Sequence, residues 1–173
     1  MRISGFPFSL AIEHPKVAVL SAVETVNPAI VSTLDAACLT LMARRGQVHG
    51  AIVDGPLAFD NAISVAAAKE KGIVSDVAGD ADILLVPDLV SGNILAKDLE
   101  YLARAVAAGV VMGLSAPVVL TSRADPPASR LASLALAVLM FHGRPKLPSK
   151  PLSPVPHPHL APQPDHACCP LPG

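Results

Sequence analysis

The sequence has few aromatic residues and no long apolar run. Tryptophan is absent, and aromatic residues make up 3% of the 173 residues, although hydrophobic residues make up 51%. The core must therefore be built from Ala, Val, Leu and Ile, which is typical of helices packed on a parallel sheet. The longest apolar run, 132–141, is about half of the roughly 20 residues that span a bilayer, so we expect no membrane contact.

Charge and cysteine are also scarce. The net charge is −1, so no basic field favours nucleic acid as a partner. The apolar start of the chain is broken by Gly5 and Pro7, which argues against a signal peptide. Cys38 stands alone on a predicted helix face, where we expect a buried thiol, and the adjacent Cys168 and Cys169 form no disulfide framework. We therefore expect a cytoplasmic protein.

Proline, in contrast, is abundant at one end. Ten of the 18 prolines lie between Pro145 and Gly173, which predicts a disordered tail over 144–173. His157, His159 and His166 in this tail match no ordered zinc template, so we expect no metal site. Residues 1–14 form a separate N-terminal segment, and 15–143 form the predicted α/β domain.

Within this domain, apolar runs alternate with helix-like segments. The pattern predicts a mostly parallel, open sheet with flanking helices. The expected strands are 17–23, 51–53, 81–86, 110–113 and 118–121, and the expected helices are 34–45, 59–71, 93–107 and 128–141. Ser32 or Thr33 is the expected cap of the first helix, and Gly46 and Gly72 are the expected stops of the first two.

Two acidic turns follow predicted strands. Ligands of open α/β sheets bind where the strands end, so such turns indicate a cleft. Asp54 and Gly55 follow the second strand. Asp54 either holds a ligand or caps the helix that begins near Phe59, and turn chemistry alone leaves both alternatives open.

The second acidic turn is longer and carries Asp88, Gly92 and Asn93. Gly92 permits close approach of a ligand, and helix N-terminal amides bind anions. Lys97 lies four residues after Asn93, on the same helix face, where a cation would help to hold phosphate. The alternative is that Lys97 is a solvated surface residue.

The loop after the last predicted strand carries Ser122, Arg123 and Asp125. Arg offers a rigid fork for phosphate, Ser a hydroxyl and Asp a base. Alternatively, Asp125 or Ser129 caps the last helix and Arg123 pairs with Asp125. Dinucleotide, Walker and nucleophile-elbow motifs are all missing from the sequence. The missing dinucleotide and metal-ligand signatures argue against another enzyme of this broad fold, such as a dehydrogenase.

Together, these motifs resemble the phosphate acetyl/butyryltransferase family, most closely the transferase half of bifunctional enoyl-CoA hydratase/phosphate acetyltransferases. The resemblance covers roughly 14–139 and rests on several ordered motifs at family-like spacing. They are Val17–Glu24, Asp54–Ala62, Ala78–Asp88, Gly92-Asn93 with Lys97, and Thr121-Ser122-Arg123.

The resemblance implies an isocitrate/isopropylmalate-dehydrogenase-like fold of two domains with the active site between them. It also implies the reversible conversion of acyl-CoA and phosphate to acyl phosphate and CoA. Ser122 would stabilise the thioester carbonyl, Arg123 would bind phosphate, and the turns at Asp54-Gly55 and Gly92-Asn93 would line the cleft. Coenzyme A would be a substrate, with no cofactor or metal required, and the protein would be a homodimer.

The sequence departs from the family in two respects. Many acetyltransferases have an Asp seven positions after the active-site Ser, where this chain has Ser129. Asp125 is typical of the butyryltransferase-like branch and is the candidate base. Family members are also considerably longer, and much of the difference precedes the first strand. We therefore expect an incomplete, truncated form, with a catalytically inactive fragment that retains CoA or phosphate binding as the alternative.

Overall fold

The computed structural model describes residues 12–111, 114 and 116–142 of the chain. The predicted tail over 144–173 and residues 1–11 of the predicted N-terminal segment lie outside this range. The strands are β1 Lys16–Leu20, β2 Ile52–Leu57, β3 Ile83–Leu85, β4 Val110–Val111 and β5 Val118–Val119. The helices are α2 Val31–Arg44, α3 Phe59–Ile63, α4 Val65–Glu70, α5 Leu89–Tyr101 and α6 Pro127–His142.

A parallel sheet of three strands, in the order β2-β1-β3, confirms the predicted α/β class. β1 is central, and four of its five residues are buried, as a continuously apolar strand with both faces covered requires. Ala18 and Leu20 of this strand share a core cluster with Leu57, Ala62 and Val77. The core thus consists of small and aliphatic side chains, as the composition predicts.

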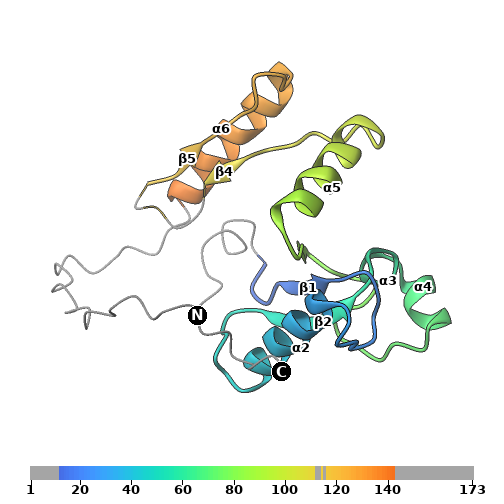
Figure 1. Cartoon of the computed structure of the whole chain (residues 1–173). Helices are drawn as coiled ribbons and strands as arrows, with labels where there is room; N and C mark the ends of the chain where they lie inside the picture. The colour runs from blue at the N-terminus through green and yellow to red at the C-terminus, as the bar shows by residue number, and fades with distance from the viewer. Residues whose placement is uncertain (1–11, 112–113, 115, 143–173) are drawn as a thin grey trace, which may run out of the picture.

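A second group of elements follows β3 (Figure 1). The helix α5 leads away from the sheet, and α6 packs on the antiparallel pair β4–β5. The two strands of this pair are shorter than predicted, and the helix predicted at 93–107 begins four residues earlier and ends at Tyr101. None of the 13 residues of α5 is buried against the described parts of the chain.

Several local predictions are wrong. The strand predicted over 17–23 ends at Leu20. The strand predicted to end at Val53 continues through Asp54, Gly55 and Pro56, a course that sequence disfavours because Pro lacks a ladder donor. The helix predicted over 59–71 breaks at Ser64, which accepts a hydrogen bond from the Ala67 amide and so caps α4. Cys38 is exposed instead of buried.

Of the two predictions for the ends of α2, the one for its start is wrong and the one for its end is confirmed. Ile30 precedes the helix, and no side chain caps it there; the Thr33 hydroxyl instead donates to the carbonyl of Ile30 at 2.7 Å. At the other end, Gly46 follows the helix with φ +70°, a left-handed conformation that glycine adopts freely. Within 12–111, 114 and 116–142, no helix is long and apolar enough to cross a membrane.

Candidate functional site

A crevice of about 390 Å³ opens at the carboxyl ends of β1 and β3. The chain leaves β1 toward β2 on one side and returns to β3 on the other, so this edge is the switch point of the sheet. Open α/β sheets bind their ligands at such points, and the volume is within the range of small-molecule sites. The crevice is lined by Leu20, Ser21, Ala22, Ser32, Phe59, Val86, Pro87, Asp88, Ser91 and Leu95.

One wall of the crevice is the start of α5, where Asp88 is the N-cap. Its carboxylate accepts a hydrogen bond from the Ser91 amide at 2.9 Å, and this bond lowers the pKa of Asp88. The helix begins at Leu89, so Gly92 and Asn93 lie in its first turns instead of before it. The Asp88 carboxylate already occupies an amide at this helix N-terminus and adds a negative charge there. The terminus is therefore less favourable for an anion than the sequence predicts.

The opposite wall is the segment that follows β1. The Ser21 amide donates to the carbonyl of Leu57 at 2.9 Å, and the Ser21 and Ser32 hydroxyls share a hydrogen bond of 2.8 Å. Further along the segment, the Thr33 hydroxyl accepts from the Asn27 amide at 2.9 Å, and its single proton is shared between the carbonyls of Ile30 at 2.7 Å and Asn27 at 2.9 Å. These bonds tie the loop of 21–30 to the beginning of α2.

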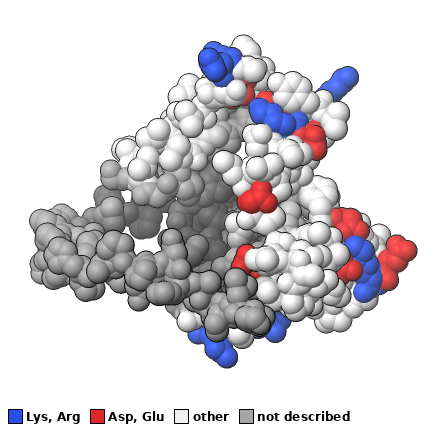
Figure 2. Space-filling view, in the orientation of Figure 1, with Lys and Arg blue, Asp and Glu red and all other residues white. Residues whose placement is uncertain are grey.

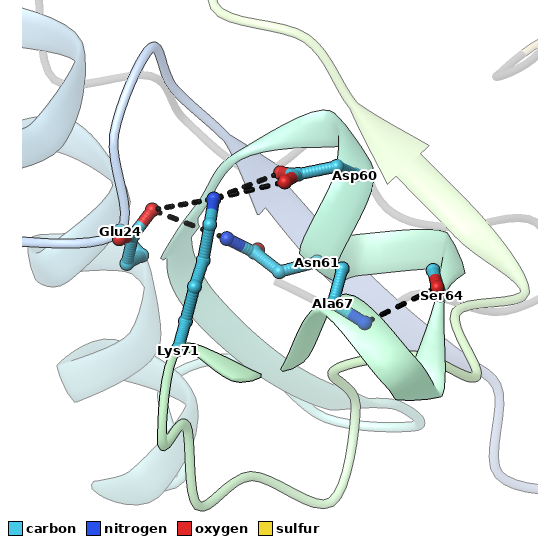
Figure 3. A network of polar contacts seen from close by, with 6 residues as sticks. All are labelled: Glu24, Asp60, Asn61, Ser64, Ala67 and Lys71. Atoms are coloured by element: carbon cyan, nitrogen blue, oxygen red, sulfur yellow. Dashed lines mark hydrogen bonds and ion pairs between the residues drawn. The ribbon is translucent and has the colours of Figure 1, made fainter. Parts of the chain in front are cut away.

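A polar network holds the same loop from the other side (Figure 3). Glu24 accepts a hydrogen bond from the Asn61 side-chain amide at 3.2 Å, and its carboxylate lies 3.3 Å from Nζ of Lys71. Lys71 also pairs with Asp60 at 2.9 Å, which raises the pKa of Lys71 and lowers the pKa of Asp60. The loop after β1, α3 and the residue after α4 are thereby joined at one point.

Asp54 and Gly55 do not line this crevice. Asp54 lies within β2, opposite Ala18 of β1, and borders another hollow of about 460 Å³ together with Arg44 and Asp76. Ala58 is the N-cap of α3, without a side-chain cap, so Asp54 does not cap that helix either. A Cβ on Gly55 would lie 2.6 Å from the carbonyl oxygen of Val19, so close packing of the two strands explains this glycine.

Lys97 lies further along α5 and has a partner. Its ammonium group is 2.7 Å from Glu100 and 5.7 Å from the ring centre of Tyr101. The bond to Glu100, with the charge of Asp125 nearby, raises the pKa of Lys97. Lys97 is therefore a paired, half-buried cation, and Asn93, one turn earlier on α5, is exposed.

Ser122, Arg123 and Asp125 form the loop between β5 and α6, outside the crevice lining. Asp125 accepts a hydrogen bond from the Ser122 amide at 2.6 Å. Its side chain therefore stabilises the turn of this loop and is not the cap of α6. Ser122 and Arg123 are exposed. Ser129, the position of the aspartate found in many acetyltransferases, is 2% exposed and its hydroxyl has no hydrogen-bond partner among the described residues.

The structure thus brings only part of the predicted set together. Asp88 lines the crevice, and a Cβ on Gly92 would lie 2.7 Å from the crevice residue Val86. Asp54 and the loop of 122–125 lie elsewhere. Ser21 and Ser32 were missed as site residues. Ser21 directly follows β1, but the strand was predicted to continue to Val23, so this strand end was not recognised. No sequence signal marks Ser32 as part of the crevice.

Charged side chains avoid the middle of the face shown in Figure 2. Lys, Arg, Asp and Glu gather over α3 and α4 and over the C-terminal end of α5. Between them, the described part of this face is mostly uncharged, with isolated acidic groups. Among the residues that the structure describes, no group of three His, Cys, Asp or Glu side chains is placed to hold a metal ion.

Comparison with known proteins gives a consistent result. Residues 7–138 match a family model described as phosphate acetyl/butaryl transferase. The chain is 62% identical over 133 residues to a phosphate acetyltransferase of Rickettsia felis, covering 76% of this chain and 38% of that protein. It is 57% identical over 124 residues to a probable phosphate butyryltransferase of Bacillus subtilis, covering 72% of this chain and 42% of that protein.

Solved structures agree with these relatives. A branched-chain phosphotransacylase from Enterococcus faecalis superposes with a TM-score of 0.70 at 40% identity, covering 78% of this chain and 48% of that one. A phosphotransacetylase from Staphylococcus aureus gives a TM-score of 0.62 at 27% identity, covering 78% and 42%. The chain therefore spans less than half the length of the relatives it matches.

Proposed function

The chain belongs to the phosphate acetyl/butaryl transferase family, and we propose that it takes part in reversible acyl transfer between coenzyme A and phosphate. The observation that carries this proposal is the match of residues 7–138 to the family model. The crevice at the switch point supports it, because open α/β sheets bind their ligands at such positions and the crevice lies within the matched segment. Coenzyme A is then a substrate, and the reaction needs neither a cofactor nor a metal ion.

In this reaction, the sulfur of CoA attacks the carbonyl carbon of an acyl phosphate. A C–S bond forms, the C–O bond to phosphate breaks, and the thiol proton leaves with a base. We assign Ser122 to the developing oxyanion, Arg123 to the phosphate and Asp125 to the proton, since a hydroxyl, a guanidinium and a carboxylate suit these tasks. Asp88, Gly92, Asn93 and Lys97 would bind substrate along α5, and Asp54 and Gly55 would support the adjoining strand.

The short span of the chain supports a second candidate. The curated relatives are covered over 36% to 44% of their length, so the chain carries only part of the surface that a complete member brings to its substrates. The alternative is an inactive α/β fragment that binds CoA or phosphate. For either candidate, we propose the cytoplasm as the compartment and a homodimer as the assembly, with acyl-CoA and phosphate as ligands and no nucleic acid or membrane.

A coupled measurement separates the two candidates. The purified 173-residue chain is mixed with acetyl phosphate or butyryl phosphate and CoA, and thioester formation is followed by absorbance. We expect thioester to form with CoA and not with desulfo-CoA, the matched control that lacks the reacting thiol. If no thioester forms but calorimetry shows that CoA binds, the result supports the inactive fragment and contradicts the active transferase. Failure in both measurements contradicts both candidates.

A further inference from the structure

The wall of the crevice is largely apolar, and its polar groups are already paired with one another. The hydroxyls of Ser21 and Ser32 share a hydrogen bond, and the amide and hydroxyl of Ser91 both donate to Asp88. The apolar part of the lining is Leu20, Ala22, Phe59, Val86, Pro87 and Leu95. Polar groups that are satisfied in this way gain little from a new partner, so the crevice favours an apolar occupant.

The rim of the crevice is exposed and acidic. Phe59 is 38% exposed, and the first two residues of α5, Leu89 and Val90, are 86% and 70% exposed. Apolar surface that lies open beside a hollow marks an interaction site. The hydrogen bond from the Ser91 amide lowers the pKa of Asp88, so this carboxylate is ionised near neutral pH. None of the described residues that line the crevice is Lys, Arg or His, so the rim suits a positively charged neighbour.

The sequence that follows α6 has the matching properties. Proline recurs there at every third position, namely at Pro145, Pro148, Pro151 and Pro154. A polyproline II helix has three residues per turn, so in this conformation the four prolines form one apolar ridge, with about 9 Å between neighbours. Between 144 and 164 the sequence has no Asp or Glu, and its cations are Arg144, Lys146 and Lys150. The stretch 144–155, here called the basic proline segment, is therefore apolar along one face and positively charged beside it.

We propose that the basic proline segment, which follows the described part of the chain, occupies the crevice of its own molecule. Proline ridges bind apolar grooves that carry an aromatic ring, and Phe59 supplies the ring here. A polyproline II helix is largely preformed, so docking it costs little conformational entropy. In this arrangement successive prolines lie on the apolar wall and a lysine lies near Asp88. Any other ligand of the crevice must then displace the segment.

The covalent tether makes this contact effective even if it is weak. The helix α6 ends at His142, and the nine residues from there to Pro151 reach about 28 Å. That is about twice the radius of gyration of roughly 14 Å expected for a domain of about 130 residues. A short flexible tether gives an effective concentration in the millimolar range. A contact with a dissociation constant of about 0.1 mM would therefore be about 90% occupied.

Proteolysis of the full chain measures this occupancy. A lysine-specific endoprotease has one good site in the segment, the bond from Lys146 to Leu147, because Lys150 is followed by proline. Cleavage follows the population of the open state, so 90% occupancy should slow this cut about tenfold. Mass spectrometry gives its rate separately from every other cut in the chain.

Ala22→Arg tests the crevice side of the contact. Ala22 lines the crevice and is exposed, so an arginine there fills the hollow and repels the lysines of the segment. Cleavage after Lys146 should then be about tenfold faster than in the parent chain. Ala29→Arg is the matched control, because Ala29 lies in the same loop, is exposed and does not line the crevice. It should be cut at the parent rate.

A pair of proline variants tests the segment side without touching the folded domain. Replacing Pro148 and Pro151 by alanine breaks the ridge, so the NMR signals of the Ser21 and Ser91 amides should shift. Replacing Pro162 and Pro164 by alanine removes as many prolines outside the three-residue period and should leave these signals in place.

Three results would overturn the proposal. They are equal cleavage rates in Ala22→Arg and Ala29→Arg, crevice signals that ignore the loss of Pro148 and Pro151, and protection that increases with protein concentration. The last result would place the segment of one copy on another copy. None of these measurements involves thioester formation, so the contact and the proposed function can fail independently of each other.

Discussion

Asn61 is fully buried, and its side-chain amide donates to the carboxylate of Glu24 across 3.2 Å (Figure 3). Glu24 belongs to the loop that forms one wall of the crevice, and Asn61 belongs to α3, which follows the neighbouring strand β2. The contact is specific because the buried Asn61 amide would lose its partner without Glu24, whereas the partly exposed Glu24 would keep Lys71. It therefore fixes the crevice wall relative to the sheet, without contacting the crevice itself.

The pairing of Lys71 with Asp60 predicts how stability depends on pH. The pKa of Lys71 is raised above 10.5, so its contribution is present below that value and is lost as the pH rises through the folded-state pKa. The pKa of Asp60 is lowered below 3.8, so its contribution is present above that value and is lost as the pH falls through the folded-state pKa. Urea unfolding over a pH series measures both limbs.

The variant Asp60→Asn tests the predicted loss of stability at acid pH. Asp60→Asn should lose less stability on acidification than the parent chain, since the carboxylate that pairs with Lys71 is gone. Asp35→Asn, which removes an exposed carboxylate from α2, is the control and should follow the parent curve. Identical acid limbs for Asp60→Asn and the parent would show that the ion pair contributes nothing. About 1 M salt should shrink the difference, because both side chains are partly exposed.

Gly55→Ala should destabilise the chain by about 1–3 kcal/mol, the cost of overpacking a close contact. The added Cβ would lie 2.6 Å from the carbonyl oxygen of Val19 and 2.9 Å from its Cβ, and Val19 is itself buried in the central strand. Thermal unfolding followed by circular dichroism gives the loss.

The matched control for that change is Gly72→Ala. Gly72 has φ +66° and nothing within 4 Å of the position of an added Cβ, so the variant reports only the backbone preference, about 1 kcal/mol. A cost for Gly55→Ala no greater than that for Gly72→Ala would contradict the explanation of Gly55 by close packing of β1 and β2.

The two buried serines of α6 should respond differently to removal of the hydroxyl. Ser133 accepts from the Gly109 amide at 2.9 Å and donates to the Ser129 carbonyl at 2.8 Å, so Ser133→Ala should cost about 1–2 kcal/mol. The Ser129 hydroxyl has no partner among the described residues, so Ser129→Ala should be neutral or stabilising. Denaturant titration of both variants gives the comparison, and equal losses would contradict it.

Ser122→Ala and Arg123→Ala test the assigned chemistry. Loss of an oxyanion donor lowers the rate by about a hundredfold or more, so we expect Ser122→Ala to reduce kcat with little change in KM. Arg123→Ala should raise the KM for phosphate or acyl phosphate. Because both side chains are exposed, neither change should alter the melting temperature. Unchanged kinetics in either variant would remove its assigned role.

Asp125→Asn tests whether Asp125 is the base, and its effect on the loop must be considered too, because Asp125 also accepts a hydrogen bond from the Ser122 amide. The Asn side chain keeps an acceptor for that amide but cannot take up the thiol proton, so the loop should stay folded while the rate falls. The measurement is the pH profile of kcat. A normal rate in Asp125→Asn at all pH values would eliminate it as the base.

The sequence predicted the elements whose signal is local. β1 is a continuous apolar run, and α6 is a long apolar helix that the structure places within one residue of both predicted ends. Gly46 marked the end of α2 because its backbone is left-handed there. The course of β2 could not be predicted, because it passes through Pro56 and proline is rare within strands. Proline is tolerated in edge strands, and β2 is an edge strand of its sheet.

The site was less predictable because it depends on contacts between distant segments. Asp88 was predicted as a site residue and lines the crevice, but its bond to the Ser91 amide, which makes the start of α5 less favourable for an anion, is visible only in three dimensions. Ser32 lines the crevice and is hydrogen-bonded to Ser21, a contact that no sequence pattern indicates. Asp54 looked like a strand-end residue only because the end of its strand was placed too early.

The exposure of α5 has a consequence for how the molecule opens. Amides of β1, which is buried between two neighbouring strands, can exchange their hydrogens with solvent only when the whole sheet comes apart. Those of α5, which packs against the core cluster through Leu95 but has no buried residue, are released by fraying of a single helix. Deuterium uptake should therefore proceed in two well-separated phases along one polypeptide, with the helix beside the crevice exchanging first.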